Sequence, residues 1–233
     1  MLRIDIISGV PSLLESPLSN SIVGRAREKG IVDIHIHDLR NYSEDKHRKI
    51  DDYPYGGGAG MVLSIQPIFS CIEKLKNERT YDDIIFTAPD GKKYEQSDAN
   101  QLSVCKNLMI LCGHYKGVDH RVRETLITKE YSIGDYVLSG GEIPALVITD
   151  SIVRILPGAL GDSESALTDS FQESLLSAPV YTRPAIYKGM KVPEVLTSGN
   201  HKKVEAWRKE KAIQRTKQFR PDLFKKFQKE SKA

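Results

Sequence analysis

The sequence predicts an α/β domain with a mostly parallel sheet, followed by a small basic helical domain. Over the first 156 residues, short β-branched or apolar segments alternate with longer segments of helical periodicity, a pattern typical of parallel sheets. A stretch rich in Gly, Ser, Thr and acidic residues follows Pro157, and a long basic helical pattern begins at His201. We therefore expect an α/β domain over residues 1–157, a flexible linker over 158–177 and a basic helical domain over 178–233.

Five strands are expected in the α/β domain. Residues 108–112 form a continuous apolar run, as expected of a strand that is buried on both faces of a sheet. Residues 31–37 alternate β-branched and polar side chains, which indicates a half-buried strand. The remaining strands are expected at 2–7, at 83–87 and near 136–138.

Helices are expected between these strands and in the basic domain. They are residues 12–30, 67–76, 96–105, 119–127 and 142–156, then 201–219 and a last helix that starts with 221–227. Gly30 suits the position just after a helix end, Asp119 can cap a helix start, and Pro157 can end the helix that precedes it. Residues 41–60 are expected to form a long polar, glycine-rich loop.

Length and composition exclude several classes of protein. With 233 residues, 39% hydrophobic and 28% charged, the chain has the usage of a globular protein with a core of its own. Its three cysteines, Cys71, Cys105 and Cys112, include no C-x-x-C pair, so neither a disulfide framework nor a zinc ribbon is expected. No apolar run approaches the ~18 residues that span a bilayer, and charges interrupt the N-terminal apolar stretch, unlike in a signal peptide. We expect a soluble, cytoplasmic protein.

Charge is unevenly distributed along the chain. The net charge is +3, but residues 200–233 hold 12 Lys or Arg against 4 Asp or Glu. The first 199 residues hold 22 basic against 27 acidic residues. A basic segment on a slightly acidic body suggests a polyanionic partner such as nucleic acid, although a solvated basic tail would have the same composition.

Three segments combine glycine with polar residues where a core would need apolar ones. They are residues 51–61, 111–119 and 132–144. Glycine lets the backbone approach a ligand closely, and the second segment follows the expected buried strand, where parallel sheets bind ligands. Thr87, Ala88 and Pro89 occupy the end of another expected strand. Each segment could equally be a tight connection or a flexible loop, and the first has neither P-loop nor Rossmann spacing.

Several single residues allow both a structural and a functional interpretation. His35 and His37 share a strand face but lack a third metal ligand, so surface positions are the simpler reading. Cys105 and Cys112 lie in apolar context and fit as packing residues. Asp169 alone indicates no more than a helix N-cap, whereas Arg154 lies on an otherwise apolar helix and needs an anionic partner or a solvent edge.

Four motifs taken together resemble one family. They are Pro54-Tyr55-Gly56-Gly57-Gly58, Cys112-Gly113-His114-Tyr115, the run YSIGDYVLSGGE from Tyr131 to Glu142, and Tyr181-Thr182-Arg183-Pro184. The family is the bacterial TrmD type of tRNA (guanine-N1-)-methyltransferase, and the resemblance covers nearly the whole chain. It implies a SPOUT fold with a deep trefoil knot, and a homodimer whose active sites are shared between subunits. It also implies methyl transfer from S-adenosylmethionine to N1 of guanine 37 of tRNA, where another guanine precedes it.

The resemblance also implies roles for individual residues. Asp169 would be the base that removes the N1 proton, and Arg154 would stabilise the charge that develops on the guanine O6. The linker with Asp169 would order over the site when tRNA docks. The residues expected to bind the donor are Thr87, Ala88, Pro89, Gly113, Tyr115, Gly117, Ile133, Gly134, Asp135, Tyr136, Val137, Leu138, Gly140, Gly141 and Pro144. The residues expected to contact RNA phosphates are Lys202, Lys203, Arg208, Lys209, Lys211, Arg215 and Lys217.

One position departs from the family pattern. Many relatives have Glu where this chain has Lys116, and that Glu is among the groups placed near a divalent cation that the family's activity requires. An ammonium group cannot ligate a cation, so a Mg²⁺ site in this chain would need other oxygens, and no metal ligand is assigned.

Two other functions account for part of the sequence. Another knotted RNA methyltransferase could act on a ribose 2′-OH, but such a target needs no base for guanine N1, and Asp169 therefore argues against it. A non-catalytic RNA-binding module would explain the basic domain, but not the intact glycine loops together with Arg154 and Asp169. Binding of S-adenosylmethionine would distinguish an enzyme from such a module.

Overall fold

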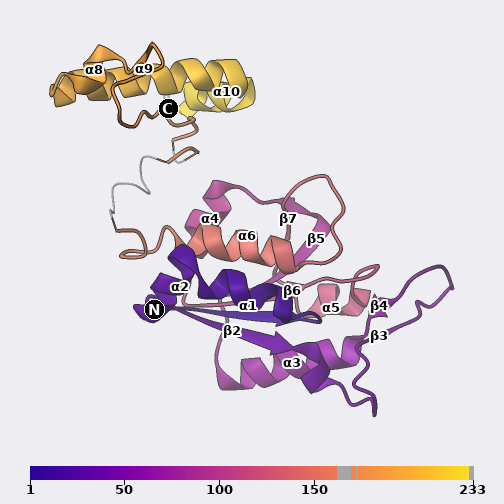
Figure 1. Cartoon of the computed structure of the whole chain (residues 1–233). Coiled ribbons are helices and arrows are strands. Elements are labelled where there is room, and N and C mark those ends of the chain that lie inside the picture. The colour runs from indigo at the N-terminus through magenta and orange to yellow at the C-terminus, as the bar shows by residue number, and fades with distance from the viewer. Residues whose placement is uncertain (162–168, 172, 231–233) are drawn as a thin grey trace. The chain divides into compact units, whose positions relative to one another are not determined.

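The structure is a computed structural model that describes residues 1–161, 169–171 and 173–230. The chain divides into two compact units, Met1–Ser163 and Glu164–Ala233. Figure 1 shows the strands of the large sheet and their helices in unit 1, and helices α8 to α10 in unit 2.

Unit 1 is built on a five-stranded parallel sheet with the order β2-β1-β6-β5-β7. The strands are β1 (Leu2–Ser8), β2 (Val32–Asp38), β5 (Asp83–Lys93), β6 (Asn107–Cys112) and β7 (Lys129–Ser132). The central strand β6 is buried from Leu108 to Cys112. The predicted α/β architecture with a mostly parallel sheet is therefore confirmed.

Helices cover both faces of this sheet (Figure 1). One face packs against α1 (Ser12–Ser19), α2 (Ser21–Glu28), α4 (Gln96–Leu102) and α6 (Glu142–Val153), and the other against η1 (Leu39–Tyr42), α3 (Ile65–Glu78) and α5 (His120–Thr125). Alternate residues of β6 enter the two cores: Leu108 and Ile110 enter the first, Met109 and Leu111 the second. This alternation follows from the period of two in a strand.

Three sequence predictions differ from the structure of unit 1. The predicted strand near residues 136–138 is wrong, because Val137 is 92% exposed and lies in a loop, whereas the last strand is β7. Strand β5 continues to Lys93 through an irregularity in its pairing with β7, so Ala88 and Pro89 lie inside it. The helix expected over 12–30 is interrupted at Asn20, whose extended backbone separates α1 from α2.

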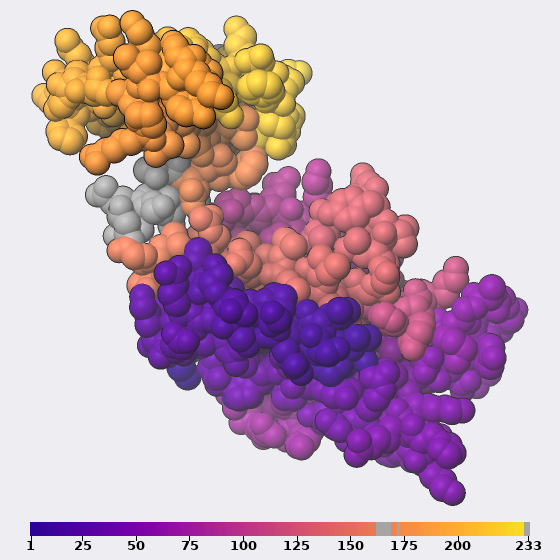
Figure 2. All heavy atoms as spheres, in the orientation of Figure 1, coloured from indigo at the N-terminus to yellow at the C-terminus, as the bar shows by residue number. Residues whose placement is uncertain are grey.

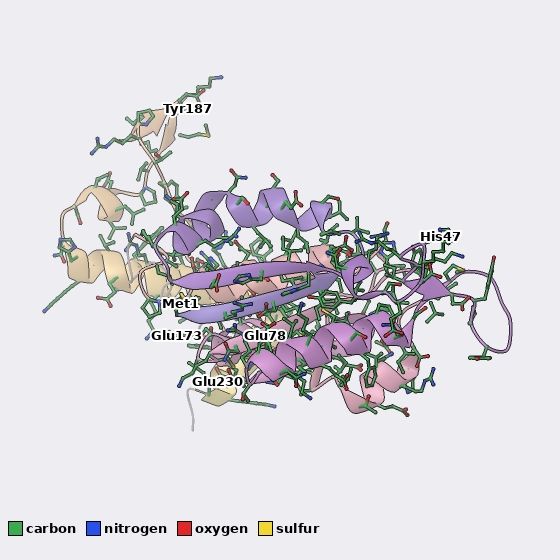
Figure 3. The ribbon with its side chains drawn as sticks, turned by 90° about the horizontal axis from the view of Figure 1, so that it is seen from below. Met1, His47, Glu78, Glu173, Tyr187 and Glu230 are labelled. Carbon is green, nitrogen blue, oxygen red and sulfur yellow. The ribbon has the colours of Figure 1, made fainter. Side chains whose placement is uncertain are left out.

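The short hairpin of β3 (Asp51–Asp52) and β4 (Val62–Leu63) carries the glycine-rich loop. In Figures 1 and 2 this loop projects from the body of unit 1. Figure 3 shows His47 at the same end of the unit and Met1 and Glu78 toward the opposite end, where β1 begins and α3 ends. The loop therefore lies toward the carboxyl ends of the sheet strands.

Unit 2 consists of α8 (Glu194–Thr197), α9 (His201–Phe219), α10 (Pro221–Glu230) and a hairpin of β8 (Ile186–Tyr187) and β9 (Met190–Lys191). Figure 3 labels Tyr187 on this hairpin. Helix α9 has the bounds that the sequence predicts, and Asn200 caps it by accepting a hydrogen bond from Lys203 N–H. Leu176 N–H donates to Oγ1 of Thr216 at 2.8 Å, which attaches the segment before the hairpin to α9. No described helix is both long and apolar enough to cross a membrane.

Candidate functional site

A pocket of about 150 Å³ opens at the carboxyl ends of β6 and β7, beside the irregular middle part of β5. Its walls are the irregular part of β5, the turn after β6, and the loop between β7 and α6. The lining residues are 86–89, 113–117, 131–134, 136–141 and Pro144. Ligands of parallel α/β sheets bind at this edge, because the connections there leave a crevice.

Fourteen of the fifteen residues expected to bind the donor line this one pocket. Asp135 belongs to the same loop but is not among the lining residues. Six lining residues were not expected to bind the donor, namely Phe86, His114, Lys116, Tyr131, Ser132 and Ser139. All of them except Tyr131 are adjacent in sequence to an expected donor-binding residue. Their position next to selected glycines or strand ends was the available signal.

Two glycines allow the three walls to approach each other. Gly141 N–H donates to the carbonyl of Gly113 at 2.7 Å, and the Thr87 hydroxyl donates to the carbonyls of Leu111 and Gly141 at 3.2 and 3.3 Å. A Cβ at Gly141 would lie 2.6 Å from the nitrogen of Gly113 and closer still to Thr87 Oγ1. Since no side chain fits there, glycine is required at position 141.

The buried carboxylate of Glu142 lies next to the pocket and contacts one of its lining residues. Glu142 is 1% exposed, and its Oε1 accepts a hydrogen bond from Ser8 Oγ at 2.7 Å. Its Oε2 lies 4.0 Å from Nδ1 of His114, which lines the pocket and forms an isolated bridge with Gly140. The end of β1, the turn after β6 and the start of α6 are thus joined around one side chain.

The loop between β7 and α6 presents apolar side chains to solvent. Tyr136 and Val137 are 56% and 92% exposed. Gly134 has a φ of +152°, and its carbonyl accepts a hydrogen bond from Tyr136 N–H at 3.0 Å. Exposed apolar groups beside a pocket are suited to a ligand with an apolar surface.

The pocket offers backbone groups and apolar walls but almost no charge. Among the described residues, Lys116 is the only Lys, Arg, Asp or Glu that lines it. Burial, and then the nearby charge of Asp51, raises the pKa of Tyr115, so its hydroxyl stays protonated at neutral pH. Burial also raises the pKa of Cys112 well above its ordinary value, which agrees with a packing role for this thiol.

No metal centre is found in the part of the chain that the structure describes. Within it, no group of three or more His, Cys, Asp or Glu side chains could hold an ion. His37 instead contacts Oδ1 of Asp5 at 2.7 Å, and His35 contacts Asp33 at 2.8 Å. Within the described residues, the histidines that the sequence singled out are therefore engaged with aspartates and form no metal cluster.

The remaining predicted residues fall in both units. Arg154 is the C-cap of α6 in unit 1, whereas Asp169 belongs to unit 2 and is half-buried. All seven residues expected to contact phosphates lie on α9, and five of them are exposed, namely Lys202, Lys203, Arg208, Lys209 and Lys217. The roles of Asp169 and Arg154 rest on the sequence resemblance.

Fold and pocket define an α/β protein with a pocket at the edge of a parallel sheet where such proteins bind ligands. The family model described as tRNA (Guanine-1)-methyltransferase TrmD matches residues 2–226. The chain belongs to this family.

Three relatives named tRNA (guanine-N(1)-)-methyltransferase are similar to the chain over almost its full length. The protein of Bacteroides fragilis is 58% identical, covering 95% of this chain and 99% of the relative. That of Christiangramia forsetii is 60% identical, covering 95% and 98%. That of Cytophaga hutchinsonii is 59% identical, covering 98% and 97%.

Proposed function

We propose that this protein transfers a methyl group from S-adenosylmethionine to N1 of guanine 37 in tRNAs that also have guanine at position 36. The observation that supports this function best is the gathering of fourteen expected donor-binding residues around one pocket in a chain of this family. The expected SPOUT knot, a homodimer with shared active sites and a cytoplasmic location form part of the same proposal.

The pocket suits the donor chemically. S-adenosylmethionine supplies an electrophilic methyl group on a sulfonium, whose charge disappears on transfer. Walls without carboxylates, such as Leu138 and Pro144, do not stabilise that charge in the ground state. Backbone N–H and C=O groups at Gly113 and Gly140 can contact a purine and ribose because no side chain stands in front of them.

Asp169 and Arg154 act on the guanine in this proposal. Asp169 accepts the N1 proton while N1 bonds to the methyl carbon and the carbon–sulfur bond breaks. A carboxylate is a weak base for this proton, so the negative charge that develops on O6 must be stabilised at the same time. The guanidinium of Arg154 has that role, as a fixed donor aimed at developing charge.

Methyl transfer to two tRNA transcripts tests the function. One transcript has guanines at positions 36 and 37, and the other has adenine at 36. We expect N1-methylguanine, identified by mass spectrometry, in the first transcript only. A methyl group on ribose or on another base would contradict the proposed target. If the wild-type protein methylated neither transcript, the proposed methyltransferase activity would be wrong.

A further inference from the structure

The pocket has one cationic side chain at its mouth, and nothing in the proposed reaction uses it. Lys116 lies in the turn after β6 and is exposed. Among the twenty described residues that line the pocket, it is the only Lys, Arg, Asp or Glu. A single charge on an otherwise uncharged rim selects for a ligand of opposite sign there.

The stem of Lys116 is held in place by the glycine-rich hairpin. Its N–H donates to the carbonyl of Met61 at 3.0 Å, and Leu63 N–H donates to the carbonyl of Gly117 at 3.0 Å. A Cβ at Gly60 would come within 2.9 Å of Lys116 Cγ and 3.2 Å of Cε, so the stem lies flat against this glycine. A stem already ordered loses less entropy when its ammonium binds an anion.

The ammonium has no carboxylate within ion-pair distance in the parts of the chain that the structure describes. Two other lysines of unit 1 do form ion pairs: Lys129 with Asp83 and Lys92 with Asp98, each at 2.6 Å. Lys116 is therefore open to an external anion, and its position at the pocket places that anion next to the bound ligands.

We propose that Lys116 binds a phosphate of the RNA strand beside the guanine that enters the pocket. This inference rests on the proposed function. A phosphate is favoured over the carboxylate of the donor, because the donor also carries a sulfonium and an amino group that a lysine would repel. Tyr115 and Tyr136, 49% and 56% exposed on the same rim, add ring faces for bases, and a cation beside aromatic rings is typical of single-stranded RNA sites.

Lys116→Met tests the proposal, because Met keeps the apolar stem against Gly60 and removes the charge. The matched control is Lys76→Met on α3, which also removes one exposed lysine but lies away from the pocket lining. Lys116→Arg restores the charge. The measurements are tRNA affinity by fluorescence anisotropy over a range of salt, and S-adenosylmethionine affinity by calorimetry without tRNA.

We expect Lys116→Met to weaken tRNA binding about fivefold at physiological salt and to lower the slope of log affinity against log salt by about 0.7 to 0.9. Donor affinity should stay within twofold, Lys116→Arg should restore the slope, and Lys76→Met should change neither quantity.

Weaker donor binding with normal tRNA binding would overturn the proposal and would indicate that Lys116 binds the donor carboxylate instead. An effect equal to that of Lys76→Met would also overturn it. A wild-type protein that binds tRNA but transfers no methyl group would contradict the proposed function, while this binding test would still decide the role of Lys116.

Discussion

The Thr87 hydroxyl donates a hydrogen bond to the carbonyl of Gly141 at 3.3 Å, across 54 positions of sequence. The same hydroxyl is 3.2 Å from the carbonyl of Leu111, so it joins the edges of β5 and β6 to the start of α6. Thr87 is 4% exposed. The pocket therefore has its walls fixed by buried contacts before any ligand arrives, which reduces the cost of ordering them on binding.

Gly141→Ala should disrupt this junction. The added Cβ would meet the nitrogen of Gly113 at 2.6 Å as well as Thr87, and the backbone would have to move. We expect a loss of stability of about 1–3 kcal/mol and at least a tenfold loss of S-adenosylmethionine affinity, measured by thermal unfolding and calorimetry. Gly161→Ala is the control, because nothing lies within 4 Å of a Cβ there. Normal donor binding by Gly141→Ala would mean that the donor binds elsewhere.

Asp169→Asn tests the base directly. The amide keeps the shape of the side chain but cannot accept the N1 proton, so methyl transfer should slow by about 10²–10⁴-fold while tRNA affinity stays within threefold. Single-turnover assays with saturating donor and tRNA measure this step. Glu173→Gln removes a nearby exposed carboxylate of unit 2 and should leave the rate unchanged. A near-normal rate for Asp169→Asn would remove Asp169 from the mechanism.

Arg154→Gln should act on the same step through the charge on O6. We expect a fall in the transfer rate of about 10²–10³-fold, with donor affinity retained because Arg154 does not line the pocket. Arg25→Gln on α2 removes an exposed arginine of the same unit and serves as the control. If Arg154→Gln lowered only donor affinity, the residue would support the pocket rather than the guanine.

Two walls of the pocket could be predicted from the sequence because Thr87 to Pro89 and the turn at 113–117 follow predicted strands of one parallel sheet, whereas the loop between β7 and α6 was indicated only by its glycines and residues 51–61 do not line the pocket. The turn after β6 follows the apolar run 108–112, which is buried at the centre of the sheet. Because the carboxyl ends of parallel strands meet at one edge of a sheet, residues as far apart in sequence as Thr87 and Pro144 line the same pocket. Glycine was the signal where two backbones approach each other, as at Gly141.

The error at residues 136–138 has a physical cause. Their apolar side chains suggested a strand, but Val137 faces solvent beside the pocket. Strand β7 was missed because it lies at the sheet edge and carries charges that other elements neutralise: Lys129 pairs with Asp83 at 2.6 Å, and Glu130 pairs with Arg123. Such pairing depends on tertiary contacts that the local sequence pattern does not contain.

Asp5 gives a stability prediction that depends on pH. Burial would raise its pKa, but hydrogen bonds from His37, Arg3 and Tyr81 outweigh burial and hold the pKa well below its usual range. A folded pKa below the unfolded value of about 3.9 means that this stabilisation is complete above about pH 5 and is lost as the pH falls below about 4.

Asp5→Asn should therefore cost about 3–5 kcal/mol at pH 7, because Arg3 loses the charge of its buried partner. The difference from wild type, measured by urea unfolding between pH 2 and pH 7, should shrink on acidification. Asp33→Asn is the control, since its carboxylate is 36% exposed and pairs with Arg3 at 3.3 Å; it should cost no more than about 1 kcal/mol. A difference for Asp5→Asn that is independent of pH would show that its charge does not contribute.

The basic face of α9 gives the last prediction. Arg208 and Lys211 are three residues apart and share a helix face. If both contact phosphates, the variant Arg208→Gln/Lys211→Gln should lower the slope of log tRNA affinity against log salt by about 1.4–1.8. The variant Lys225→Gln/Lys226→Gln on α10 removes the same charge and should lower the slope by less than half as much. Equal effects of the two variants would mean that unit 2 attracts tRNA by its overall charge and not through α9, because only direct contacts depend on where the charge lies.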